Sequence, residues 1–150
     1  MAAAGQGQEI GYRIHRPLTL ASGDRDRVLT VPADESGMIQ MDGPAVYQKA
    51  VKAMMDSLSR AAEASGFDAT ALELIVPHQA NQRIINAVRQ RMKLDKSRVF
   101  SMIAEYGNTS SSTIPLCLEK LAIDKVAPAT MGLTAFGGGY TYAAAVLEKM

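Results

Sequence analysis

A histidine that could move protons lies in the segment Pro77-His78-Gln79-Ala80-Asn81, which follows a predicted strand and opens a predicted helix. Imidazole can give or take a proton near neutral pH. In open α/β sheets, ligands bind at the carboxyl ends of strands, which is the position that His78 would occupy. Alternatively, Gln79 or Asn81 caps the following helix by accepting hydrogen bonds from its first N–H groups. Both interpretations stay open on these residues alone.

A second polar segment, Tyr106-Gly107-Asn108-Thr109-Ser110, also follows a predicted strand and precedes a predicted helix. Two such corners on neighbouring strands can direct their side chains into one crevice. The carboxamide of Asn108 would then serve the same site as the imidazole. The alternative is that Asn108, Thr109 or Ser110 simply caps the helix, because Asn and Ser are preferred N-cap residues.

Three consecutive glycines, Gly137-Gly138-Gly139, separate the last two predicted strands. A backbone without side chains can approach a ligand closely and can offer N–H groups to an oxyanion. The alternative is a tight hairpin turn, which needs glycine for its own geometry. The segment is not a phosphate loop, because neither the GxxxxGK[ST] nor the GxGxxG pattern surrounds it.

Alternating helices and strands must position these three segments. Apolar residues recur at helical spacing over 44–65 and 81–93, whereas a helix predicted over 110–123 is apolar nearly all round. A helix of that kind is normally buried on several sides. Strands are predicted over 11–14, 27–31, 72–76, 99–103, 130–136 and 140–147. The alternation predicts a layered α/β domain with a mostly parallel sheet.

The composition is that of one ordinary globular domain. The chain has 150 residues, 47% hydrophobic and 21% charged, so a real core is possible. A net charge of +1 gives no case for binding nucleic acid or a membrane surface. With one cysteine and two histidines, we expect neither an internal disulfide nor a zinc site. No apolar run reaches about 18 residues and residues 1–8 lack signal-peptide features, so we expect a cytoplasmic protein.

Taken together, the three polar and glycine segments resemble the β-ketoacyl-acyl carrier protein synthase III family of the thiolase-like superfamily. Pro-His-Gln-Ala-Asn, Tyr-Gly-Asn-Thr-Ser and Ala-Phe-Gly-Gly-Gly occur here in the family's order. The opening of the first long helix, Met-Asp-Gly-Pro-Ala-Val-Tyr, also matches, so the resemblance covers residues 41–147. Asparagine at position 108, where thiolases proper and elongating synthases commonly have histidine, favours the type III or chalcone synthase-like branch.

The resemblance implies that the chain is the C-terminal half of a thiolase-like α/β fold, with a five-stranded mixed sheet, flanking helices and one largely buried helix. Residues 1–26 would form a poorly defined segment and residues 27–150 the synthase III-like domain. The family's catalytic triad is Cys-His-Asn, and His78 and Asn108 match its second and third members. Gly138 matches the residue whose backbone N–H helps to stabilise the acyl tetrahedral intermediate. The nucleophile belongs to the absent first half, and we interpret Cys117 as a buried apolar residue.

The implied activity is acyl transfer, by decarboxylative Claisen condensation of an acyl thioester with malonyl-acyl carrier protein in fatty acid or polyketide synthesis. CoA and acyl carrier protein thioesters would be the substrates, and no cofactor is implied. Loss of carbon dioxide leaves an enolate, whose oxygen needs hydrogen-bond donors such as neutral His78 and the Asn108 amide. The implied partners are acyl carrier protein, contacted by Gln79 and Arg83, the missing N-terminal half, and a second copy in the full-length homodimer. We expect the chain alone to be inactive.

Further basic residues follow Arg83 and could guide an acidic carrier protein, or could simply form a solvated face. They are Arg89, Arg91, Lys93, Lys96 and Arg98. Two other functions stay open. One is a non-catalytic partner or carrier-protein-binding half-domain that pairs through its apolar helix. The other is a chalcone synthase-like condensing enzyme that uses CoA thioesters directly. His15 is isolated in the sequence and is interpreted as a surface or loop histidine.

Overall fold

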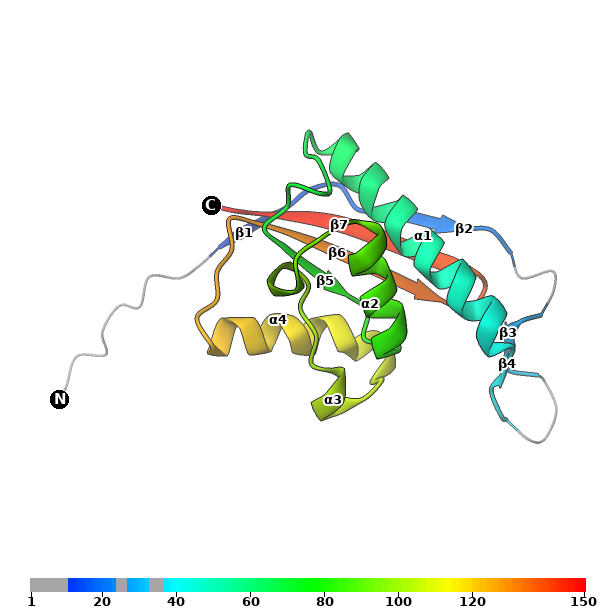
Figure 1. The fold of residues 1–150 in the computed structure, drawn as a ribbon. Helices are drawn as coiled ribbons and strands as arrows, with labels where there is room; N and C mark the ends of the chain where they lie inside the picture. Colours follow the sequence, from blue (N-terminus) through cyan, green and yellow to red (C-terminus); the bar gives the residue numbers. More distant parts are fainter. Residues whose placement is uncertain (1–10, 24–26, 33–36) are drawn as a thin grey trace.

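The fold is a layered α/β arrangement in which helices cover both faces of one sheet (Figure 1). The computed structural model describes residues 11–23, 27–32 and 37–150. The strands are β1 (Tyr12–Ile14), β2 (Leu18–Ala21), β3 (Leu29–Thr30), β4 (Gln40–Met41), β5 (Leu74–Pro77), β6 (Thr130–Gly137) and β7 (Thr141–Lys149). The helices are α1 (Gly43–Ala64), α2 (Gln82–Arg91), α3 (Ile103–Tyr106) and α4 (Thr113–Ile123), with 3-10 turns η1 (Lys96–Arg98) and η2 (Ser110–Ser112). The expectation about a signal peptide falls on residues outside this description.

The main sheet has five strands in the order β1-β7-β6-β5, with β2 also paired to β7. β5 and β6 are parallel, and Val76 lies opposite Leu133. β6 and β7 are antiparallel because a short turn joins them directly, and β1 and β2 are both antiparallel to β7. The predicted five-stranded mixed sheet is therefore confirmed. The prediction of a mostly parallel sheet, made from helix–strand alternation alone, is wrong.

Part of the segment that the sequence assigns to a poorly defined N-terminus contributes to this sheet. β1 and β2 form regular antiparallel pairs with the two ends of β7. The short strand predicted over 27–31 lies elsewhere, because β3 pairs with β4 in a separate two-stranded sheet. The boundary at residue 27 stays a prediction.

The strand predicted over 99–103 is wrong beyond its first residues. Val99 makes one parallel bridge with Ile75, and the N–H of Phe100 donates to the carbonyl of Ile75 at 2.9 Å. The ladder then ends, because the N–H of Met102 donates to the side-chain oxygen of Gln79. A side chain thus takes the place that a neighbouring strand would have, and α3 begins at the next residue.

Helix α1 confirms the helix predicted over 44–65. The side chain of Asp42 accepts a hydrogen bond from the N–H of Ala45 at 3.1 Å, and Pro44 occupies the first turn, where its missing N–H costs nothing. The helix ends before Gly66, which has a φ of +80° that suits glycine. The buried residues of α1 recur at helical spacing and are Val46, Ala50, Val51, Met54, Ser57, Leu58, Ala61 and Ala62.

Alternate residues of the main sheet's strands pack into two cores, one on each face. Ile75 and Val146 pack with α1 and α2 on one face of the sheet. Leu74, Val76 and Leu147 pack with α4 on the other. Figure 1 shows α1 and α2 together in front of the strands and α4 along another side of them. Because His78 follows β5 directly, it lies at the end of a strand that both cores share.

Helix α4 departs from the expectation that it is buried on several sides. Its buried residues are Thr113, Cys117 and Leu121, which form a single stripe. Ile114 is only half-buried, and Ile123 is 68% exposed. The reason is that the described residues provide one packing layer for this helix, the α4 side of the sheet, and nothing on its opposite side.

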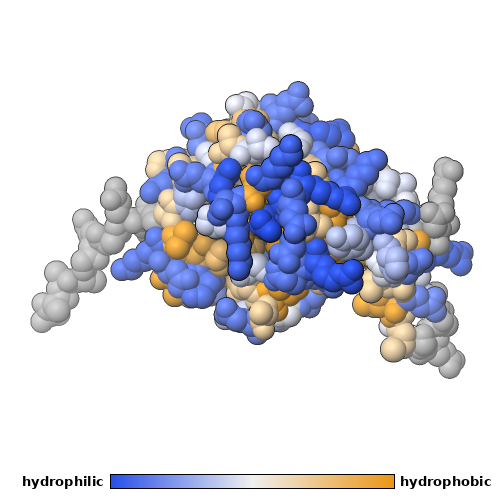
Figure 2. Space-filling model, viewed as in Figure 1, coloured by the Kyte–Doolittle hydropathy of each residue, from blue (hydrophilic) through white to orange (hydrophobic). Residues whose placement is uncertain are grey.

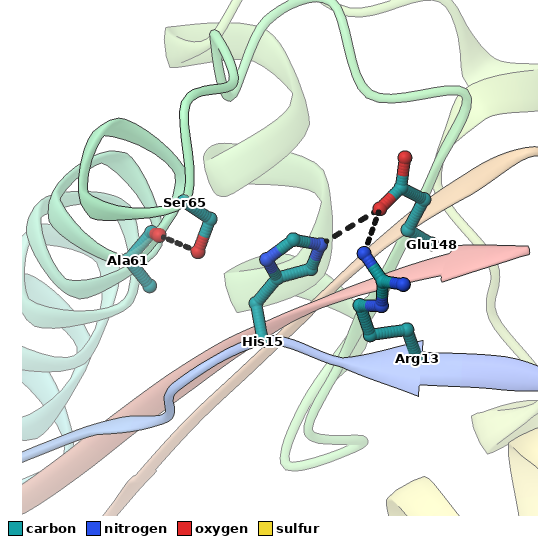
Figure 3. A network of polar contacts seen from close by, with 5 residues as sticks. All are labelled: Arg13, His15, Ala61, Ser65 and Glu148. Carbon is teal, nitrogen blue, oxygen red and sulfur yellow. Dashed lines mark hydrogen bonds and ion pairs between the residues drawn. The ribbon is translucent and has the colours of Figure 1, made fainter.

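His15 lies in the loop between β1 and β2, which fits its interpretation as a loop histidine, and it also makes contacts with residues distant in the sequence. Its Nε2 lies 3.1 Å from a carboxylate oxygen of Glu148, which also pairs with Arg13 at 4.0 Å (Figure 3). Its ring also meets Phe67 edge-on, with 5.4 Å between ring centroids. These contacts join the β1–β2 edge of the sheet to the loop after α1. None of the helices in the described ranges has the length and apolar character needed to cross a membrane.

Candidate active site

A cleft of about 1440 Å³ lies beside the carboxyl end of β5, with walls from α1, α2, the β3–β4 pair and the β6–β7 turn. The predicted site residues that line it are His78, Arg83, Asn108 and Gly138. Exposed apolar side chains of Val31, Ile39 and Met41 contribute to its wall. Figure 2 shows apolar surface at the right of the molecule, where Figure 1 places β3 and β4. The cleft therefore combines polar groups with an apolar approach, as ligand sites commonly do.

His78 follows directly on β5 and is anchored at both its backbone and its ring. Its N–H donates to the carbonyl of Thr134 on β6 at 2.8 Å, so the parallel pairing of the sheet fixes the backbone. Its Nδ1 lies 2.6 Å from Oγ1 of Thr113. Partial burial lowers the pKa of His78 below its ordinary value, because the charged ring would lose solvation. The ring is therefore neutral at neutral pH.

Asn108 lies in the loop between α3 and α4 and is exposed to the cleft. Gly107, which precedes it, has a φ of +67° and turns the chain at the end of α3. The side-chain oxygen of Asn108 accepts a hydrogen bond from the N–H of Ser110 at 3.0 Å, which holds the loop. Neither η2 nor α4 has a side-chain cap at its start, so the capping interpretation is wrong for this segment. The amide nitrogen is left as a donor on the same cleft as His78.

Gly137, Gly138 and Gly139 join β6 to β7 and line the cleft. Gly137 pairs with Thr141, so the glycines do form a hairpin turn, and Gly139 adopts a φ of +123° that an L-residue rarely takes. Gly138 is exposed, and a Cβ there would meet nothing closer than 3.7 Å. The hairpin and the open backbone wall are thus the same feature, and neither interpretation excludes the other.

Gln79 is the predicted site residue that the structure does not bring to the cleft. It is 1% exposed, and its amide nitrogen donates to the carbonyls of Pro77 at 2.7 Å and Phe100 at 3.4 Å. Its side-chain oxygen accepts from the N–H of Met102 at 3.0 Å. A carrier protein therefore has no access to this side chain. The carrier-protein contact expected for Gln79 is therefore corrected. Its side chain instead makes internal hydrogen bonds that join the segment around His78 to the loop that contains Phe100 and Met102.

Arg83 is exposed at the cleft, on the first turn of α2. Its position is fixed by Asn81, whose side chain accepts from the N–H of Arg83 at 2.8 Å and caps the helix. Its guanidinium lies 5.7 Å from the ring centroid of Tyr47 on α1, within cation–π range. Arg91, two turns further along α2, also lines the cleft.

Two of the other basic residues have structural partners. Arg98 donates to the carbonyls of Thr70 and Leu72, which fixes the loop before β5. Arg89 donates to the carbonyl of Leu94 at 3.2 Å and closes the end of α2. The basic run is therefore not one uniform docking face.

Two features of α4 complete the site's surroundings. Thr113 contacts the His78 ring, yet the sequence offers it only as one of several hydroxyl residues at a helix start. Cys117, one turn further, is fully buried, and burial raises the pKa of its thiol to about 11. It is therefore a protonated thiol with no access to substrate, as interpreted from the sequence. In the part of the chain that the structure describes, no three His, Cys, Asp or Glu side chains cluster as metal ligands would.

The arrangement offers hydrogen-bond donors rather than a strong acid or a nucleophile. A neutral imidazole, a carboxamide nitrogen and a glycine backbone share one cleft. Donors of this kind stabilise an oxygen on which negative charge develops during a reaction.

Comparison with known proteins points to one family. Residues 62–149 match the family described as 3-oxoacyl-[acyl-carrier-protein (ACP)] synthase III C terminal. The β-ketoacyl-[acyl-carrier-protein] synthase III of Chlorobium phaeobacteroides is 41% identical over 106 residues, which are 69% of this chain and 32% of that protein. The corresponding protein of Aquifex aeolicus is 39% identical over 118 residues, 77% of this chain and 38% of that protein.

A solved structure extends the likeness to nearly the whole chain. The crystal structure of 3-oxoacyl-(acyl carrier protein) synthase III from Pseudomonas aeruginosa matches with a TM-score of 0.84 and 36% sequence identity. The match covers 97% of this chain and 46% of that one, so this chain spans less than half the length of each of these relatives. The chain belongs to the family of 3-oxoacyl-[acyl-carrier-protein] synthase III C-terminal domains.

Proposed function

We propose that this chain is the C-terminal half of an acyltransferase that condenses an acyl thioester with malonyl-acyl carrier protein. The observation that carries the proposal is the shared cleft, in which neutral His78, Asn108 and Gly138 surround the carboxyl end of β5. The relatives named above are β-ketoacyl-[acyl-carrier-protein] synthases III, and their greater length leaves room for a first half that holds the acyl group. We propose residues 27–150 as the synthase III-like domain, with β1 and β2 of the preceding segment completing its sheet.

In the proposed reaction, the bond between the malonyl carboxylate and the α-carbon breaks, and its electron pair remains as an enolate while carbon dioxide leaves. His78 and Asn108 each donate a hydrogen bond to the enolate oxygen. The α-carbon then attacks the acyl thioester held by a cysteine of the first half. The tetrahedral oxyanion accepts the N–H of Gly138 and collapses, which expels the cysteine thiolate and releases the 3-oxoacyl product.

We propose acyl carrier protein as the partner at the cleft mouth, with Arg83 and Arg91 meeting its acidic surface. Both arginines are exposed on α2 and line the cleft, as does Lys52 on α1. Exposed charges of this kind mainly raise the rate of encounter, and salt weakens them. Direct use of CoA thioesters, as in a chalcone synthase-like enzyme, remains a separate outcome of the test below.

The half-exposed face of α4 supports the proposal that a first half covers this helix. Ile114, Leu116 and Leu118 are each only partly buried, although apolar side chains of this kind are normally shielded. The same face favours the second candidate function, a non-catalytic half-domain that pairs with another polypeptide. In the full-length protein we propose a homodimer and a cytoplasmic location.

The test is to co-express this chain with the first half of the Pseudomonas aeruginosa relative and to assay condensation with malonyl-acyl carrier protein and malonyl-CoA. The two halves of that relative, co-expressed, are the positive control. We expect product with the carrier-protein substrate, and loss of product in His78→Ala and Asn108→Ala. Product from malonyl-CoA alone would favour the chalcone synthase-like alternative. A stable complex without condensation would favour the non-catalytic partner.

By itself the chain is expected to form no acyl-enzyme, because Cys117 is buried and its thiol stays protonated. Incubation with acetyl-CoA followed by intact-mass measurement checks this. A stable acetyl adduct that maps to Cys117 would contradict it.

A further inference from the structure

Behind the cleft, the ring of His78 is held by a residue that none of the three sequence motifs assigns to it. Its Nδ1 lies 2.6 Å from Oγ1 of Thr113, the first residue of α4. Thr113 is 2% exposed, so its hydroxyl is shielded from water. Over the described ranges, no other hydrogen bond to either of these two atoms is formed. Among the described residues, the contact is therefore the hydrogen bond that engages Nδ1.

Either atom could donate in this hydrogen bond, and burial selects the hydroxyl. A buried hydroxyl needs an acceptor for its hydrogen. If Nδ1 carried the ring proton, Oγ1 would have to accept it, and the hydroxyl hydrogen would find no acceptor in the described part of the chain. If Nδ1 is unprotonated, the hydroxyl donates to it and both buried groups are satisfied. Burial also lowers the pKa of His78, which disfavours the doubly protonated ring.

We propose that Thr113 is a positioning residue, which donates its hydroxyl hydrogen to Nδ1 and thereby holds His78 as the neutral Nε2–H tautomer. The position of the proton on a histidine is set by the hydrogen bond that the other ring nitrogen makes. With Nδ1 engaged by α4, the N–H lies on the nitrogen that remains for the cleft. The tautomer is inferred from the hydrogen bond and from the burial of Thr113, whereas its purpose, donation to an enolate oxygen, rests on the proposed function.

This placement also explains why the start of α4 must be held firmly beside β5. Thr113 shares the buried stripe of α4 with Cys117 and Leu121, which pack against the sheet. The backbone of His78 is bonded to β6 through the carbonyl of Thr134. The hydroxyl and the ring thus belong to two elements that pack in the same core. Because both elements are already fixed by that packing, the hydrogen bond forms without an additional loss of conformational freedom.

The tautomer can be measured directly by long-range proton–nitrogen NMR on the chain labelled with ¹⁵N-histidine, with His78 assigned by its loss in His78→Gln. We expect Nδ1 to show a pyridine-type shift and Nε2 a pyrrole-type shift near pH 7.5. Thr113→Val keeps the shape of the side chain but removes the hydroxyl, and we expect the two shifts to move toward each other as the tautomers mix. Thr113→Ser keeps the hydroxyl and should restore the wild-type pattern.

A proton on Nδ1 in the wild-type chain would overturn the proposal, and so would a Thr113→Val spectrum identical to the wild type. The wild-type measurement stands even if Thr113→Val fails to fold. In the co-expressed two-half enzyme, we expect Thr113→Val to lower kcat by about tenfold or more and Thr113→Ser to retain activity, because a wrong tautomer removes the donor. If the wild-type pair shows no condensation while the Nε2–H tautomer is observed, the proposed function fails and the assignment of Thr113 stands.

Discussion

Helices α1 and α4 cover opposite faces of the same sheet, and they bury their apolar residues to very different extents. α1 is amphipathic, and its apolar stripe is closed against β6, β7 and α2. α4 carries apolar residues nearly all round but buries only the stripe that faces the sheet. The apolar residues in a helix sequence thus indicate how much of its surface could be buried. The structure shows how much of that surface the described residues of the same chain actually bury. The difference locates the apolar surface that the described residues leave uncovered.

The largest effect is expected where the core is closed. Leu58 on α1 is fully buried, so Leu58→Ala removes its packing and leaves a cavity beneath the helix. We expect the free energy of unfolding to fall by about 2–5 kcal/mol, measured by urea denaturation monitored by circular dichroism. A loss below about 1 kcal/mol would mean that the α1 core is as loosely packed as the outer side of α4, and the contrast between the helices would fail.

The same core should also resist enlargement. Gly132 on β6 lies beneath α1, and a Cβ there would come within 2.8 Å of methyl groups of both Leu58 and Leu72. We therefore expect Gly132→Ala to destabilise the chain by about 1–3 kcal/mol through overpacking. Differential scanning calorimetry measures the change. Gly43→Ala, where a Cβ would meet nothing within 4 Å, is the matched control at an open position. An unchanged Tm for Gly132→Ala would show that α1 can shift away from the sheet.

The two faces meet at His78, and there a smaller, pH-dependent effect is expected. Its folded-state pKa is lowered by desolvation, relative to an ordinary value of about 6.5 in the unfolded chain. Between the two pKa values the unfolded state binds more protons, so stability rises with pH in that window. The contribution is complete above the unfolded-state pKa and is lost as the pH falls through the folded-state pKa.

Urea denaturation at a series of pH values from 7.5 down to 5 measures this contribution. We expect the wild type to lose more stability over that range than His78→Gln, in which the titrating group is absent. His15 is present in both proteins, so its contact with Glu148 cancels in the comparison. Equal pH dependence in the two proteins would show that the ring of His78 is no harder to charge in the folded state than in the unfolded one.

Much of the fold and most of the candidate site could be predicted from local sequence patterns. The caps of α1 and the corner before α2 are short-range features, and His78, Asn108 and Gly138 belong to contiguous motifs. The failures have long-range causes. β2 has only four residues and gains its pairing from β7 at the other end of the chain. The missing strand after Val99 is due to the buried amide of Gln79.

The role of Thr113 could not be predicted for the same reason. Its partner lies 35 residues away, and a hydroxyl at a helix start is more commonly a cap. The apolar circumference of α4 predicts burial on several sides, and this prediction is wrong for the described residues, which bury one side only. Sequence patterns therefore indicate local geometry and which residues are apolar enough to be buried. The hydrogen-bond partners of side chains and the register of strand pairs depend on the assembled sheet.

The outer face of α4 should give the smallest effect on folding and a larger one on association. Ile123 is 68% exposed, so Ile123→Ser is expected to change the free energy of unfolding by less than about 0.5 kcal/mol. If the unpaired apolar face drives self-association of the isolated chain, the same substitution should weaken it, as sedimentation velocity over a concentration series would show. Lys125→Ser, two residues further along the chain and outside the apolar face, is the control and should leave association unchanged. An Ile123→Ser chain that unfolds as readily as Leu58→Ala would mean that α4 is closed on both sides, and the need for a second layer would disappear.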